Sequence, residues 1–104
     1  MPECVFCQIA KKELSSDIIY QDEQIIAFKD IKPLAPIHYL ILPKKHISSL
    51  NDITIEDKDL MGELMIAAQK IAREKNIPAY KLQVNVGRDA GQMIDHLHIH
   101  LLAN

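Results

Sequence analysis

The 104-residue sequence lacks the features of several protein classes. It contains no apolar run near the roughly 20 residues that span a bilayer, and the segment MPECVFCQIAKKE lacks the basic start and the apolar stretch of a secretory signal. A formal net charge of -2 gives no electrostatic reason to bind nucleic acid or anionic membranes. We therefore expect a cytoplasmic protein that binds a small ligand, without a nucleic-acid or membrane partner.

Glycine and cysteine are scarce. The three glycines form neither the GK[ST] end of a P-loop nor the GxGxxG pattern of dinucleotide-binding folds. Cys4 and Cys7 have the spacing of metal ligands, but two thiolates are half of a tetrahedral zinc site, so two histidines would have to complete it. A redox motif would follow a strand, which is not expected here. Reduced thiols without a metal remain the alternative.

The remaining composition is that of a globular domain. Hydrophobic residues make up 48% and charged residues 25%, and we expect residues 1–104 to form one domain. A short helix is expected over residues 5–13, and a long helix over residues 54–75, with Thr54 and Asp57 as a capping box. Runs of β-branched and aromatic residues predict five strands, at residues 17–22, 24–30, 38–43, 81–86 and 96–102. The prediction is an α+β domain built on an antiparallel sheet of about five strands.

The last predicted strand, HLHIHLL, carries three of the five histidines on alternate positions. Side chains two residues apart in a strand share a face and lie roughly 7 Å from each other, so His96, His98 and His100 would point the same way. The apolar residues between them would fill the core and are enough to explain the strand. Three histidines in register therefore indicate a metal site or a reaction centre.

Possible anion-binding groups precede these histidines. Gly87 and Gly91 lie in the loop before them, where glycine allows backbone N–H groups to approach an anion. Asn85 and Gln92 add neutral amide donors. A plain turn between strands explains the same glycines, so both interpretations stay open for the loop alone.

Taken together, these motifs resemble the histidine-triad (HIT) family. HLHIHLL fits its H-φ-H-φ-H-φ-φ signature, where φ is an apolar residue. The similarity extends over AFKDIKPLAPIHYLILPKKHIS, residues 27–48, and over the NVG…GQ stretch, and so covers nearly the whole sequence. The chain looks like the Hint-like branch of nucleoside phosphoramidases and nucleotidyl hydrolases. Such proteins are typically homodimers whose sheets join through a strand.

The resemblance implies a hydrolase acting on the α-phosphate of a purine nucleoside phosphoramidate or related conjugate. His98 would be the nucleophile that forms a covalent nucleotidyl-histidine, supported by His38, and Asp30 would bind the ribose hydroxyls. The α-phosphate would be held by Asn85, Gln92 and His100. The purine pocket would be lined by apolar residues for which ordinary core packing is an equal alternative: Phe6, Ile9, Phe28, Ile31 and Leu40.

Zinc-carrying members of the family imply a structural zinc ion in this protein. Relatives with C-x-x-C near the N-terminus use two cysteines, the histidine of PKKH and the first histidine of the triad. The implied ligands are Cys4, Cys7, His46 and His96. His96 would then hold the metal, and the chemistry would fall to the other histidines.

Departures from the family pattern keep a second function open. Met93 stands where relatives often have a phosphate-binding serine or threonine, and Lys29 replaces a histidine of some relatives. Many relatives also continue into a glycine-rich tail with an aromatic residue, whereas this sequence stops at Asn104. The alternative function is a nucleotide-binding sensor or scaffold with little turnover. A zinc-organised interaction domain is a third.

Overall fold

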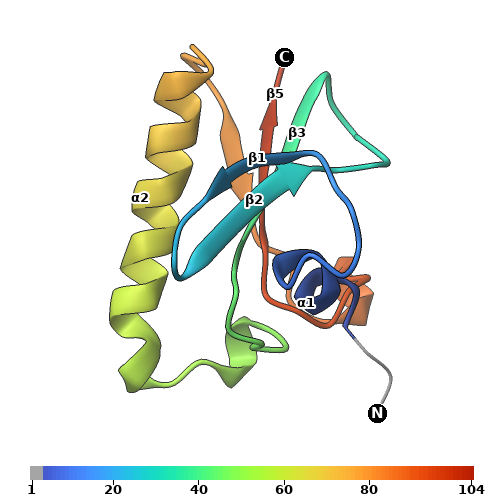
Figure 1. Cartoon of the computed structure of the whole chain (residues 1–104), viewed down its shortest axis with the longest axis vertical. Helices are drawn as coiled ribbons and strands as arrows, with labels where there is room; N and C mark the ends of the chain where they lie inside the picture. Colours follow the sequence, from blue (N-terminus) through green and yellow to red (C-terminus); the bar gives the residue numbers. More distant parts are fainter. Residues whose placement is uncertain (1–3) are drawn as a thin grey trace.

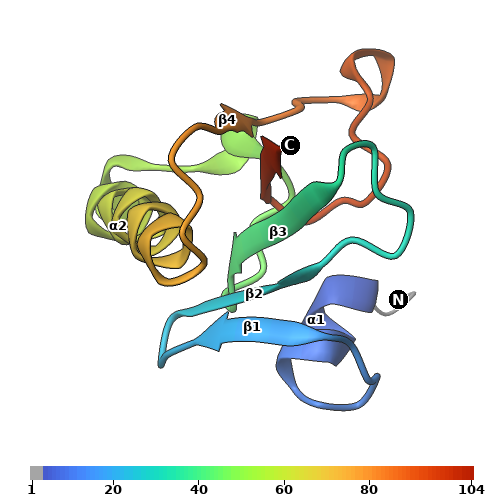
Figure 2. The ribbon, with the colours of Figure 1, turned by 90° about the horizontal axis from the view of Figure 1, so that it is seen from above.

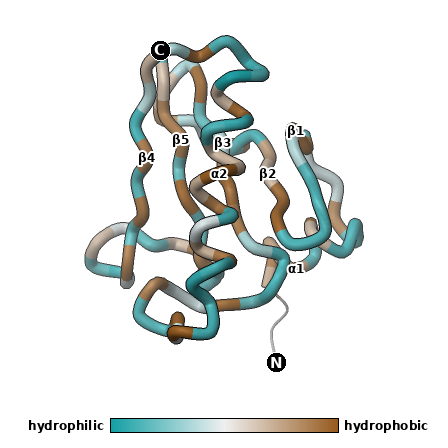
Figure 3. The backbone as a smooth tube through the Cα atoms, turned by 90° about the vertical axis from the view of Figure 1, so that its left-hand side faces the viewer, coloured by the Kyte–Doolittle hydropathy of each residue, from teal (hydrophilic) through white to brown (hydrophobic). Residues whose placement is uncertain are grey.

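A five-stranded antiparallel sheet forms the centre of the structure, a computed structural model that describes residues 4–104 (Figure 1). The strands lie in the order β1-β2-β3-β5-β4, as Figure 3 shows from the side of the long helix. Three short 3-10 helices occupy Leu50–Asp52, Ile55–Asp57 and Arg88–Ala90. The main elements are α1 (Val5–Ala10), β1 (Ile18–Gln21), β2 (Ile25–Lys29), β3 (Ile37–Pro43), α2 (Lys58–Glu74), β4 (Lys81–Gln83) and β5 (Ile99–Ala103). The predicted α+β class is confirmed.

The sheet separates two apolar layers (Figure 2). The larger layer packs against α2 and includes Ile41, Leu64 and Leu101. The smaller layer lies on the opposite face, beneath α1, and contains Phe6, Ile9, Ile26, Phe28, Leu40 and Leu42. Successive side chains of β2 and β3 point alternately into the two layers. Because both faces of these strands are covered, nearly all of their residues are apolar.

The first helix is shorter than expected and ends at Ala10 instead of residue 13. Lys12 adopts a left-handed backbone conformation with φ 64°. The N–H of Glu13 donates to the carbonyl of Gln8 at 2.7 Å, and the N–H of Lys12 donates to the carbonyl of Ile9 at 3.0 Å. These two bonds form a Schellman motif, which usually has glycine or asparagine at the left-handed position. Because a lysine occupies this position here, residue type alone does not mark the end of the helix.

The capping box of the long helix is confirmed. Thr54 Oγ1 accepts a bond from the N–H of Glu56 at 3.3 Å, and the Asp57 carboxylate accepts from the N–H of Thr54 at 2.9 Å. The first turn is a 3-10 helix, so α2 itself begins at Lys58. It ends at Glu74, and Asn76 follows in the left-handed conformation with φ 57°.

The last two strands are shorter than predicted at the site. β4 ends at Gln83, and β5 begins at Ile99, so residues 96–98 lie outside the sheet. The N–H of Leu97 donates to the carbonyl of Ile47 at 2.7 Å, in the segment after β3. This contact replaces pairing with β4. The expected division of faces nevertheless holds, because Leu97 and Ile99 are buried in the layer under α2. Within residues 4–104 no helix is long and apolar enough to cross a membrane.

Candidate active site

The middle histidine, His98, presents an unprotonated ring nitrogen. Its side chain is buried, and its Nδ1 lies 2.6 Å from the carbonyl oxygen of His96. Because a carbonyl can only accept, the proton is on Nδ1, and Nε2 keeps its lone pair. Burial lowers the pKa of His98, so the ring is neutral at pH 7. A neutral imidazole with a free nitrogen is suited to nucleophilic attack.

A chain of hydrogen bonds fixes the proton of His100. The N–H of Leu34 donates to Nδ1 of His38 at 3.0 Å, so the ring proton of His38 is on Nε2. That atom donates to Nδ1 of His100 at 2.8 Å, which leaves the His100 proton on Nε2. Nε2 of His100 is the one buried side-chain nitrogen or oxygen without a partner among the residues described. An unpaired buried donor costs about 1–3 kcal/mol, so this N–H is poised to donate to a ligand.

Asp30 lies beside this pair of histidines. Its Oδ2 is 3.4 Å from Nε2 of His38, and its Oδ1 accepts a bond from the N–H of Lys32 at 2.9 Å. Asp30, His38 and His100 bring three possible metal ligands together. The 2.8 Å distance between the two histidine nitrogens is that of a hydrogen bond, whereas two nitrogens on a tetrahedral zinc ion lie about 3.4 Å apart. His38 and His100 are therefore bonded to each other and are too close together to share a zinc ion.

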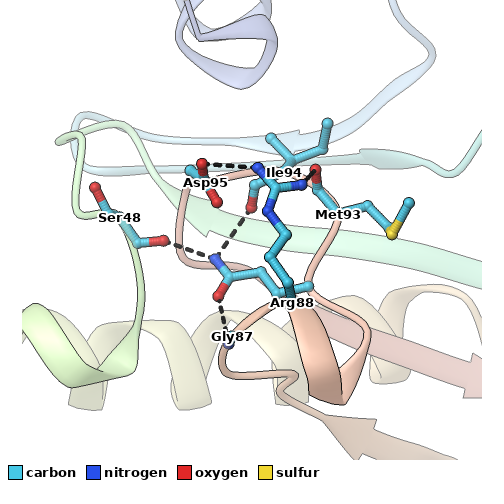
Figure 4. A network of polar contacts seen from close by, with 7 residues as sticks. Ser48, Gly87, Arg88, Met93, Ile94 and Asp95 are labelled. Carbon is cyan, nitrogen blue, oxygen red and sulfur yellow. Dashed lines mark hydrogen bonds and ion pairs between the residues drawn. The ribbon is translucent and has the colours of Figure 1, made fainter.

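The side chain of Gln92 is hydrogen-bonded to three backbone groups, on Gly87, Ser48 and Ile94, which Figure 4 labels. Its Oε1 accepts from the N–H of Gly87 at 2.9 Å. Its Nε2 donates to the carbonyls of Ser48, at 2.7 Å, and Ile94, at 3.0 Å. Both amide hydrogens are thus engaged, and the residue is 3% exposed. The Gln92 side chain therefore has no free donor in this structure for the expected direct contact with a phosphate.

The glycine loop also differs from the expected anion cradle. The backbone N–H groups of Gly91 and Gln92 donate to the carbonyls of Arg88 and Gly87, at 3.0 Å each. Because the N–H of Gly87 is held by Gln92, neither glycine offers a free donor. The glycines are instead needed for the turn, with φ 88° at Gly87 and 96° at Gly91. Met93 follows with its side chain 71% exposed, and its N–H makes no hydrogen bond within residues 4–104.

Asn85 retains two amide hydrogens for a ligand. Its Oδ1 accepts from Nε2 of Gln83 at 3.0 Å, and its Nδ2 has no hydrogen-bond partner in the described chain. The predicted donors Asn85 and His100 thus remain available.

The predicted purine-pocket residues divide into two groups. Phe6, Ile9, Phe28 and Leu40 are 3–7% exposed and pack together beneath α1, as expected from the core alternative. Ile31 lies apart from them and is 88% exposed. The ring of Phe6 also packs edge-on against that of His98, with centroids 5.1 Å apart. The short helix therefore contacts the candidate nucleophile directly.

The four predicted metal ligands come together from three segments of the chain. One ligand atom from each of Cys4, Cys7, His46 and His96 lies within 4.8 Å of the others. Sγ of Cys7 is 3.2 Å from Nδ1 of His46 and 3.5 Å from Nδ1 of His96. Sulfur and nitrogen ligands of a tetrahedral zinc ion lie about 3.6 Å apart, so these distances suit zinc.

The protonation of this cluster also fits a divalent cation. His96 Nε2 donates to the carbonyl of Pro43 at 2.7 Å, which leaves Nδ1 as the ligand atom. Burial lowers the pKa of His96 to about 4 and keeps it neutral. Burial and the neighbouring Cys4 raise the pKa of Cys7 to about 11, so adjacent thiolates need a cation to form at pH 7. A metal here would tie α1 to the histidine segment.

Sequence reasoning missed the groups that orient the site. They are mainly backbone atoms, such as the carbonyl of Pro43 and the N–H of Leu34, and residue type carries no signal for them. Gln83 was also missed. Its spacing of two from Asn85 in a predicted strand was the available signal, because such residues share a face.

Comparison with known proteins agrees with this geometry. The family model described as "Scavenger mRNA decapping enzyme C-term binding" matches residues 3–104. "Protein HitA" of Neisseria gonorrhoeae is 39% identical over 103 residues, which cover 98% of this chain and 96% of the relative. The "Purine nucleoside phosphoramidase" of Escherichia coli K12 is 41% identical over 102 residues, which cover 96% of this chain and 86% of that protein.

Solved structures give the same result. A HIT family hydrolase from Clostridium thermocellum has a TM-score of 0.95 and 44% identity, covering 100% of this chain and 92% of that one. A HIT family hydrolase from Legionella pneumophila has a TM-score of 0.94 and 40% identity, covering 98% and 93%. The chain therefore belongs to the HIT family of hydrolases, as an enzyme of the histidine-triad type.

Proposed function

We propose that the protein hydrolyses the P–N bond of purine nucleoside phosphoramidates, or the corresponding bond of related nucleotidyl conjugates, and releases the nucleoside monophosphate. The observation that carries this proposal is the bond from Nδ1 of His98 to the His96 carbonyl, which leaves Nε2 free to attack phosphorus. The relative named purine nucleoside phosphoramidase supports the substrate class.

The reaction would proceed in two displacements. The Nε2 lone pair of His98 attacks the α-phosphorus, the P–N bond breaks, and the departing amine takes a proton from solvent. The ring then carries positive charge, which the His96 carbonyl stabilises through the Nδ1–H bond. In the second step water attacks the same phosphorus and gives a proton to solvent, the bond to Nε2 breaks with its electron pair returning to the ring, and the monophosphate leaves.

Charge on the phosphoryl oxygens would be met by the unpartnered donors of the site. Nε2–H of His100 and the NH2 group of Asn85 are available in the described residues, and the N–H of Met93 is a third. A preorganised donor of this kind contributes about 3 kcal/mol to transition-state stabilisation. Met93 would thus retain a main-chain contact although its side chain cannot donate. Gln92 would act through the shape of the loop.

The nucleoside would lie on the β2 and β3 side of the histidines. Asp30 would accept bonds from the ribose hydroxyls, and Ile31, exposed beside it, would cover the purine. The outer edges of Phe6, Ile9, Phe28 and Leu40 would form the floor of that pocket.

Zinc would bind to Cys4, Cys7, His46 and His96 and would supply structural cross-linking, with no part in the displacement.

We also propose that residues 1–104 form a single domain, that the protein is cytoplasmic, and that it forms a homodimer through the free edge of β4. The exposed side chains of Met65, Ile66 and Leu82, on α2 and β4, support this interface. Light scattering of the purified protein tests the homodimer.

The decisive experiment measures AMP release from adenosine 5′-phosphoramidate by the wild type and His98→Ala. We expect His98→Ala to lose at least about 10³-fold in kcat, with its circular dichroism unchanged. Rapid quenching of the wild type should trap an adenylyl group on His98, detected by mass spectrometry. Equal rates would remove His98 as the nucleophile. Saturable AMP binding without turnover would favour the nucleotide sensor, for which the missing hydroxyl at Met93 is the supporting observation.

A further inference from the structure

The polarity of Asn85 depends on one neighbouring side chain. A carboxamide has an accepting end and a donating end, and it attracts a phosphate only when the NH2 group faces it. Gln83 Nε2 donates to Oδ1 of Asn85 at 3.0 Å, so the accepting end of Asn85 is turned toward β4. The donating end is left for the other side.

That other side is the glycine loop. A Cβ added to Gly91 would lie 3.6 Å from Nδ2 of Asn85, so the NH2 group directly faces this glycine. Gly91 has φ 96°, which disfavours any larger residue there. The NH2 group of Asn85 therefore lies against a residue without a side chain, and no group within residues 4–104 accepts from it.

Strand register places this pair beside the histidines. Gln83 is the direct partner of His100 in the antiparallel pairing of β4 and β5, and directly opposed residues project from the same face of a sheet. Asn85 lies two residues beyond Gln83, just after β4, and its side chain is bonded to that of Gln83. Its unpartnered NH2 group and the unpartnered Nε2–H of His100 thus lie on the same side of the sheet. Two such donors suit the oxygens of one phosphoryl group.

We propose that Gln83 is a positioning residue that sets the direction of the Asn85 amide and thereby keeps its NH2 group toward the phosphate. This inference rests on the proposed function. Gln83 does not touch the reacting atoms, and it is exposed on the edge strand of the sheet, outside both apolar layers. Its replacement should therefore leave the fold of the monomer intact. Because β4 is also the proposed dimer edge, light scattering of each variant should show the same mass as the wild type.

Three variants separate this role from general effects. Gln83→Glu replaces the donor by an acceptor that attracts the Asn85 NH2 group and turns Oδ1 toward the phosphate. Gln83→Met removes the hydrogen bond and keeps the side-chain length. Lys81→Gln is the control, because it changes the net charge by the same amount on the same face of β4, two residues away. Each is compared by steady-state AMP release from adenosine 5′-phosphoramidate, by calorimetric AMP binding and by thermal melting.

We expect Gln83→Met to lower kcat/KM about 5- to 10-fold, as for one lost hydrogen bond, and Gln83→Glu to lower it about 100-fold. Lys81→Gln should stay within about twofold, and all melting curves should remain similar. In an Asn85→Ala background, Gln83→Glu should cost less than about threefold, since the residue acts through Asn85. A Gln83→Glu variant with wild-type kinetics overturns the inference. An equal loss with and without Asn85 also overturns it.

The outcomes also separate this inference from the proposed function. A wild type that binds AMP without releasing it from the phosphoramidate contradicts the proposed hydrolysis. In that case the AMP affinities of the same variants decide the role of Gln83, with the same ranking expected. A wild type that neither hydrolyses the phosphoramidate nor binds AMP overturns both.

Discussion

Replacing His100 by asparagine tests the protonation assigned to the site. Burial, followed by the charges of His98 and His38, lowers the pKa of His100 to about 4, from 6.5. A histidine with a lowered pKa is neutral in the fold, while the unfolded chain takes up a proton below pH 6.5. Its contribution to stability is therefore fully present above pH 6.5 and is lost as the pH falls to 4.

The expected magnitude follows from this shift. A pKa lowered from 6.5 to about 4, at 1.36 kcal/mol per unit, sets an upper limit of about 3 kcal/mol, and solvent screening at this half-buried ring lowers the contribution to about 1–2 kcal/mol. That is still a measurable share of the 5–15 kcal/mol typical of a domain. In His100→Asn, the Oδ1 atom still accepts from His38, but the residue cannot titrate. The variant should therefore lose about 1–2 kcal/mol less stability than the wild type between pH 7.5 and pH 4.

Urea unfolding followed by circular dichroism at several pH values measures this difference. Both proteins retain the same cysteines and histidines of the metal cluster, so metal release at low pH affects both alike. Parallel dependence of the unfolding free energy on pH in the two proteins would refute the reasoning. It would mean that His100 takes up its proton at the same pH in the folded and the unfolded protein, so that burial does not keep the folded ring neutral.

Two further predictions concern the metal cluster and the loop. Protein prepared with zinc should contain about one equivalent by elemental analysis, and Cys4→Ser, which removes one of four ligands, should contain far less; unchanged zinc would exclude the proposed ligand set. Gln92→Leu removes three hydrogen bonds and leaves their buried backbone partners unpaired, so urea unfolding should show a loss of about 2–4 kcal/mol. Met93→Ala, at the exposed neighbouring position, should change stability by less than about 0.5 kcal/mol, and a similar effect of both would contradict the loop role of Gln92.

The sequence predicts those parts of the structure whose causes are local. β1, β2 and β3 follow from segments rich in isoleucine, and the start of α2 follows from Thr54 and Asp57, which lie within one turn of each other. The grouping of His96, His98 and His100 can be predicted equally well, because these histidines are alternate residues of one short segment.

Contacts between distant segments could not be predicted in this way. Gln92 looked like a phosphate ligand because its amide can donate, but its partner is the carbonyl of Ser48, 44 residues away. The early start predicted for β5 has the same cause, since the N–H of Leu97 bonds to Ile47 and not to a strand. Residue type shows which groups a side chain can bond to, whereas the fold determines which of those groups lies next to it.

The hydrogen bonds that set the ring protons of His96, His98 and His38 all have a main-chain partner. A mutation changes side chains and leaves those carbonyl and amide groups in place, so many neighbouring substitutions can accumulate during evolution without moving the free nitrogen of His98. The Asn85 amide differs, because it is oriented by the side chain of Gln83, which a mutation can change. Natural variation at position 83 would therefore change the binding of the phosphate by Asn85, whereas substitutions of residues around the histidines would be tolerated.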